Sequence, residues 1–112
     1  DAHKFNQDID SWDTSEVTDM HYMFEDAHVF NGTVGSWNTS KVVDMNGMFY
    51  GAYDFNQDVS NWDTSMVTEM ELMFAHALRF NQPLGGWHTS KVTDMRNMSA
   101  SAEAFNQNLC DW

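Results

Sequence analysis

The chain repeats itself every 25 residues, and this period constrains the fold more than any other feature. Each unit carries a phenylalanine followed by an asparagine, and a tryptophan stands seven residues after the phenylalanine. The recurring aromatic positions are Phe5, Phe30, Phe55, Phe80 and Phe105, with Trp12, Trp37, Trp62, Trp87 and Trp112. A unit of this length cannot bury its apolar face alone, so neighbouring units are expected to stack around a continuous core.

The repeat predicts a single domain over residues 1–112. Counted from the first repeated phenylalanine, the units are residues 5–29, 30–54, 55–79 and 80–104, with a partial unit at 105–112. No linker-like segment separates the units, and the only proline is Pro83. A chain of 112 residues also has the usual size of one domain.

Two kinds of periodicity alternate within each unit. Around Ile9 one apolar residue stands between polar neighbours, which predicts a short strand at residues 7–10 and at its copies. Parallel strands of successive units would lie about 4.7–4.9 Å apart. From Val17 onward the apolar residues recur at a helical spacing, which predicts a short helix at residues 19–27. The sequence therefore predicts an α/β solenoid with short parallel strands on one face and short helices on the other, although Val17 could also belong to a second small strand.

Residues at equal positions in the repeat are expected to form columns through the stack. Aromatic columns would build the core, and the asparagine after each phenylalanine would bond through its side chain to the backbone of the next unit. This asparagine ladder is predicted to be buried. The predicted ladder residues are Phe5, Asn6, Trp12, Asn31, Trp37, Asn56, Trp62, Asn81 and Trp87.

The charge balance limits the partners of the protein. There are 17 acidic residues against 5 basic residues, and the net charge is -12. Such a chain repels phosphate backbones and anionic lipid surfaces, so no nucleic-acid partner is expected. No apolar run approaches the roughly 18 residues of a membrane helix, so no membrane insertion is expected either. Proteins with basic patches are the better candidates for partners.

The repeat pattern carries a family resemblance. Residues 12–20 read W-D-T-S-E-V-T-D-M, and the pairs M-F and F-N follow at 23–24 and 30–31. This pattern resembles that of the BspA-like leucine-rich-repeat surface proteins over essentially the whole chain, with departures such as His88 and Ser99. The resemblance implies a right-handed leucine-rich-repeat coil of about 4.5 units, displayed outside the cell or on its surface. It also implies a role in adhesion and partner binding, with no catalytic residue to carry over.

No catalytic, metal or cofactor site is predicted. No serine or cysteine stands in an activating motif, so the chain is not expected to be an enzyme. Met-x-x-Met pairs have a spacing that suits copper(I), but methionines on an apolar stripe are usually core residues. The histidines have no third ligand beside them at zinc spacing. Weak calcium binding between units stays open for Asp8, Asp13, Asp58 and Asp63.

Specific recognition is expected at outward positions where the units differ, because the fold leaves these positions free. On the predicted strand side the candidates are Asp8, Asp10, Thr33, Asp58 and Ser60. On the predicted helix side they are His21, Tyr22, His28 and Tyr53.

Two functions compete at this point. The leading hypothesis is a non-enzymatic extracellular or cell-surface module for adhesion or protein–protein interaction, with its partner bound on the acidic strand side. The partner would be a protein or another component of a host or cell surface. The alternative is a structural building block whose open ends, at residues 5–12 and 105–112, pair into a homo-oligomer, filament or surface layer.

Overall fold

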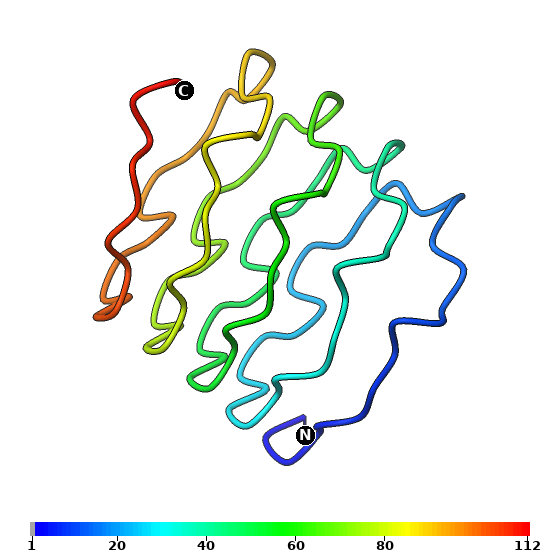
Figure 1. The fold of residues 1–112 in the computed structure, drawn as a ribbon, viewed down its shortest axis with the longest axis vertical. Coiled ribbons are helices and arrows are strands. Elements are labelled where there is room, and N and C mark those ends of the chain that lie inside the picture. Colours follow the sequence, from blue (N-terminus) through cyan, green and yellow to red (C-terminus); the bar gives the residue numbers. More distant parts are fainter. Residues whose placement is uncertain (1) are drawn as a thin grey trace.

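The computed structural model describes residues 2–112, in which the chain winds through successive coils that lie side by side (Figure 1). The molecule is compact, with extents of 35 × 31 × 19 Å and a radius of gyration of 12.7 Å. These residues contain no helix and no strand longer than a single bridge residue. The isolated parallel bridges join Asp19 to Asp44, Asp44 to Glu69, and Glu69 to Asp94. The predicted α/β solenoid, with leucine-rich-repeat-like strands and helices, is therefore wrong.

The predicted helix at residues 19–27 is replaced by linked turns, because two residues of each coil have left-handed backbone angles. Tyr22 has a φ of 50° and Asp26 has a φ of 53°. An α-helix needs negative φ at consecutive residues, so each of these residues interrupts a right-handed helical course. The same two positions are left-handed in the later coils, at Gly47, Gly51, Leu72, His76, Asn97 and Ser101.

Backbone hydrogen bonds in these turns alternate between the coil itself and its neighbour. The amide of Met23 donates to the carbonyl of Met20 at 3.3 Å, which closes a turn within the coil. The amide of Phe24 donates instead to the carbonyl of Met48 in the following coil at 2.9 Å. Apolar residues at a helical spacing can therefore face the core although no helix forms.

The predicted strand at residues 7–10 is replaced by an arc in which side chains, rather than paired backbones, join the coils. The Oδ1 atom of Asn6 accepts a hydrogen bond from the amide of Asn31 at 2.9 Å, and the indole N–H of Trp37 donates to the carbonyl of Ile9 at 3.0 Å. The same bonds recur with the amides of Asn56, Asn81 and Asn106 and the indoles of Trp62, Trp87 and Trp112. The asparagine side chains are exposed, so the prediction that they are buried is wrong, and water can reach their remaining polar atoms.

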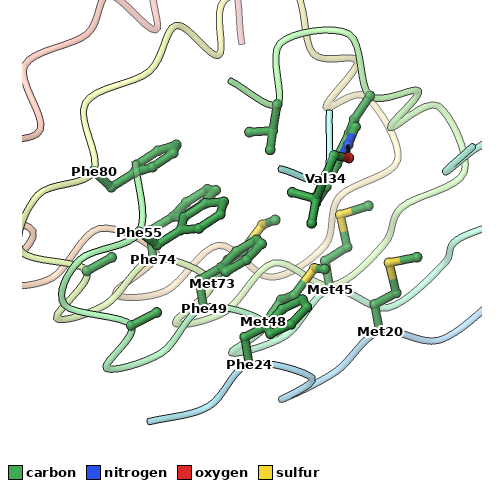
Figure 2. Packing of buried hydrophobic residues seen from close by; sticks show 14 of the residues in the cluster. Met20, Phe24, Val34, Met45, Met48, Phe49, Phe55, Met73, Phe74 and Phe80 are labelled. Carbon is green, nitrogen blue, oxygen red and sulfur yellow. Dashed lines mark hydrogen bonds between the residues drawn. The ribbon is translucent and has the colours of Figure 1, made fainter. Parts of the chain in front are cut away.

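The core is a continuous stack of aromatic, methionine and aliphatic side chains (Figure 2). The ring of Phe49 stacks on Phe55 with centroids 3.8 Å apart and on Phe74 of the next coil with centroids 5.6 Å apart. Successive tryptophan rings are 6.2–6.4 Å apart, wider than the spacing predicted for parallel strands. Each fully buried phenylalanine contributes about 1.5–3 kcal/mol. The largest side chains with no more than 1% exposure are Phe30, Phe49, Phe55, Phe74, Phe80, Met45, Met48, Met70 and Met73.

Candidate functional site

The predicted strand-side residues form one arc of the stack, which we call the acidic arc: Asp8, Asp10, Thr33, Asp58 and Ser60. The carboxylate of Asp8 accepts hydrogen bonds from the amide of Asp10 at 3.1 Å and from the hydroxyl of Thr33 at 2.8 Å. The carboxylate of Asp58 accepts from the amide of Ser60 at 2.9 Å. Local bonds of this type stabilise turns, so these side chains have a structural role.

Hydrogen bonding lowers the pKa of two carboxyls in this arc, those of Asp8 and Asp58. The Asp10 amide and the Thr33 hydroxyl lower the pKa of Asp8, whereas the Ser60 side chain and amide lower that of Asp58. A hydrogen bond donated to a carboxylate favours its charged form. Two groups among the described residues bring three potential metal ligands together, and neither includes the four aspartates considered for calcium.

Polar aromatic residues gather in a different arc of the coil. The arc comprises residues 21–28 and the equivalent positions of the other coils. It contains all three tyrosines and four of the five histidines, and His88 is the exception. These residues are Tyr22, Tyr50, Tyr53, His3, His21, His28 and His76.

A groove of about 390 Å³ lies in this arc, and we call it the tyrosine groove. Its lining residues come from all four complete units. The side chains that give it chemical character are Tyr22, Glu25, Tyr50, Leu72, His76 and Asn97.

Small residues at repeat positions that hold larger side chains elsewhere make room for the groove. Gly47 stands at the position of Tyr22 in the next coil, and a Cβ atom there would collide with the Tyr22 ring. Ala75 and Ala100 stand at the position of Tyr50 and also line the groove. The groove therefore arises where the units differ.

The polar tips of the groove are unpaired within the described part of the chain. The hydroxyls of Tyr22 and Tyr50 and the carboxylate of Glu25 have no hydrogen-bond or ion-pair partner there. The ring of His76 meets the ring of Tyr50 edge to face, with centroids 5.5 Å apart. These groups can therefore bind a ligand without first breaking an internal polar contact.

The charged residues near one end of the groove are already paired. Arg96 precedes the lining residue Asn97, and its Nη2 atom lies 2.7 Å from Asp94 and 3.3 Å from Glu71. The hydrogen bond from Arg96 and its positive charge lower the pKa of Asp94. The guanidinium of Arg96 is thus held by two carboxylates, whereas the carboxylate of Glu25 has no cationic partner among the described residues.

The remaining predicted helix-side residues, His21, His28 and Tyr53, make stacking contacts or ion pairs of their own. His28 stacks on Tyr53 with centroids 4.3 Å apart, and on His3 at the same distance. His21 pairs with Asp19, which raises the pKa of His21. Of the predicted helix-side residues, only Tyr22 lines the groove.

The side-by-side arrangement of the coils brings together two groups of possible metal ligands. One group is His3, Asp26 and His28, and the other is Asp19, His21 and Asp44. The rings of His3 and His28 are within 6° of parallel, so their lone pairs do not converge on one tetrahedral ion. Sequence reasoning missed the first group because it assigned the five histidines to five different repeat positions. The separation of His3 and His28 by one full repeat could have revealed it.

Sequence reasoning also missed three of the polar groove residues, namely Glu25, Tyr50 and His76. The available signal was the restriction of tyrosine to a few repeat positions. A second pocket of about 420 Å³ opens at the last coil, where Ser99 replaces the phenylalanine of earlier units. Phe74, Phe105 and Trp112 line it.

Together these features define a repeat protein whose coils share one core and present a lateral groove. The chain belongs to the family described as Mycoplasma protein of unknown function, DUF285, whose model matches residues 1–112. Neither a curated protein nor a solved structure matches the chain. Among the residues that the structure describes, no helix has the length and apolar character needed to cross a membrane.

Proposed function

We propose that this protein is a non-enzymatic module for adhesion or protein–protein interaction, and that its partner binds in the tyrosine groove. The observation that carries the proposal is the set of unpaired polar tips on Tyr22, Glu25 and Tyr50. Tyrosine is enriched in recognition surfaces because it is amphipathic and loses little conformational entropy when it is ordered. Display outside the cell or on its surface is part of the proposal and is supported by the resemblance of the repeats.

The acidic arc is the weaker location for this function. Its carboxylates already accept hydrogen bonds from backbone amides and from the hydroxyl of Thr33. A partner would have to compete with these bonds. The proposed contact surface is therefore the groove and not the side chains of Asp8, Asp10 and Asp58.

The test is adhesion of protein-coated beads to cell monolayers and to immobilised extracellular-matrix proteins. The informative variant is Tyr22→Asn combined with Tyr50→Ala, because the same repeat positions hold Asn97 and Ala75 in other units. Each substitution therefore installs a residue that this fold already contains. We expect bead retention to fall at least about tenfold, since central aromatic contacts dominate many interfaces.

The matched control is Tyr53→Leu, which removes an exposed tyrosine outside the groove and installs the residue found at Leu78. Retention by this variant should stay close to that of the parent protein. Equal retention by the groove variant and the parent would contradict the proposal. Loss of retention with Asp8→Thr and Asp58→Thr alone would return the contact to the acidic arc.

A second candidate function is assembly through the ends of the stack. In the first coil, Trp12 is 52% exposed and Met23 is 39% exposed, whereas their copies Trp37 and Met48 are 4% and 0% exposed. The amide of Phe74 donates to the carbonyl of Met98, but the equivalent amide in the last coil has no such partner in the described chain. Light scattering across a concentration series, with negative-stain microscopy, tests this alternative, and a monomer at all concentrations would contradict it.

A further inference from the structure

We propose that the occupant of the tyrosine groove is a cationic side chain, an arginine or lysine presented by a segment of a partner protein. This inference rests on the proposed function, because it names the partner chemistry of the same groove. Aromatic rings, an unpaired carboxylate and the negative charge of the molecule support this assignment.

The aromatic part of the site suits a cation. Tyr22 and Tyr50 line the groove from adjacent coils, and Tyr22 is 37% exposed. A guanidinium or ammonium group is attracted to the face of a tyrosine ring, and the attraction grows when water is partly excluded. Leu72 adds an apolar surface against which the methylene stem of arginine or lysine can pack.

The carboxylate of Glu25 supplies the charge that such a cation needs. It lines the groove and has no ion-pair partner among the described residues. A charge-assisted hydrogen bond from an arginine or lysine would satisfy it. An anionic ligand would be repelled by the same group.

The same arc already shows how this protein holds a guanidinium group. Arg96 lies between Asp94 and Glu71 and forms ion pairs with both. Among the described residues, Arg96 pairs with these two carboxylates and not with Glu25. The net charge of -12 would additionally steer a basic segment toward the molecule.

The experiment is isothermal titration of the protein with a hexa-arginine peptide amide and, separately, with a hexalysine peptide amide. A hexaglutamate peptide and a neutral oligosaccharide serve as comparison ligands. We expect saturable binding of the cationic peptides only. Saturable binding of the oligosaccharide with no binding of either cationic peptide would overturn the inference.

The variants separate the groove from general attraction between opposite charges. Tyr50→Ala and Glu25→Gln are each expected to weaken binding about twofold to fivefold, the range typical of one exposed cation–π contact or ion pair. The matched controls are Tyr53→Leu and Glu103→Gln, which make similar changes at exposed positions outside the groove. Each control should change affinity by less than about twofold.

Equal weakening by Glu25→Gln and Glu103→Gln would mean that the peptide binds the general negative field, and the inference would be wrong. Far-ultraviolet circular dichroism and a thermal melt check that each variant folds. If beads still need the groove for adhesion but no cationic peptide binds, this inference fails and the proposed function stands. If adhesion does not depend on the groove, the proposed function fails independently of the titration.

Discussion

The acidic arc and the tyrosine groove belong to the same repeating coil, but they use their polar groups in different ways. In the acidic arc, Asp8 bonds to Asp10 and Thr33, and Asp58 bonds to Ser60. In the groove, the tips of Tyr22, Glu25 and Tyr50 have no polar partner in the described chain. Exposure alone therefore does not distinguish a recognition surface from a surface that maintains the fold.

The comparison gives a practical criterion for repeat proteins. A polar side chain that forms a hydrogen bond within its own coil or to a neighbouring coil belongs to what we call the frame, since its loss leaves the partner group unpaired. A polar side chain with no such bond is free to change between repeats. Substitutions in the frame and in the groove should consequently differ in their effects on stability.

The largest effect is expected for Phe55→Ala in the core that the framed coils share. Phe55 is fully buried and stacks on Phe49 and Phe80. Its truncation should lower the free energy of unfolding by about 3–5 kcal/mol, because it removes apolar burial and leaves a cavity. Urea denaturation followed by tryptophan fluorescence measures this change, and a loss below about 1 kcal/mol would contradict the continuous core.

A smaller effect is expected for Trp62→Phe. The indole N–H of Trp62 donates to the carbonyl of Val34 at 3.0 Å, and the side chain is 3% exposed. The variant loses that bond and part of the ring volume, so the free energy of unfolding should fall by about 1–3 kcal/mol. The peripheral change Trp12→Phe is the control, because Trp12 is 52% exposed, and the same denaturation assay should show a smaller loss.

Acid should weaken the frame through the acidic arc. The folded-state pKa values of Asp8 and Asp58 lie below the ordinary value of 3.8, so the unfolded chain takes up protons first as the pH falls. Their stabilising contribution is complete well above pH 3.8 and is lost as the pH falls through their folded-state pKa values. Thermal melts between about pH 6 and 2 should show this loss, and Asp58→Asn should reduce the dependence on pH. Carboxyl NMR titration giving ordinary pKa values for both residues would refute the prediction.

The smallest effect on stability is expected in the groove. Tyr22→Asn and Tyr50→Ala remove side chains that make no polar bond, and each installs a residue found at the same position in another unit. Each should change the free energy of unfolding by no more than about 0.5 kcal/mol. A loss as large as that of Trp62→Phe, measured in the same urea assay, would abolish the distinction between frame and groove.

Part of this architecture could be predicted from the sequence. The period predicted stacking, and residues such as Phe30, Val34 and Met45 are fully buried in the structure. The helix was wrong because spacing does not report the sign of φ, and Tyr22 and Leu72 are not residues that usually take left-handed angles. The strand was wrong because one apolar residue between polar neighbours also describes a turn-rich arc joined by asparagine and tryptophan side chains.

The candidate site was only partly predictable, for a related reason. Tyr22 was singled out, but Glu25, Tyr50 and His76 were not, since they come from different coils and different repeat positions. Only the stacking brings them to one groove. Asp8, Asp10 and Asp58 were singled out because they stand at outward positions where the units differ, and the hydrogen bonds by which Asp8 and Asp58 cap local turns could not be inferred from that variation.

The alternating turn bonds have a consequence for how such a protein can diversify. In the linked turns each coil donates amides to the next, as Phe24 does to Met48, whereas elsewhere a coil donates back to the one before it, as Val43 does to Thr18. Both patterns recur from coil to coil. A duplicated 25-residue segment would therefore inherit suitable neighbours on both sides, with no rearrangement of the interior. Gene duplication could lengthen the outer surface one coil at a time, and later substitutions would be free to give each new segment its own partner.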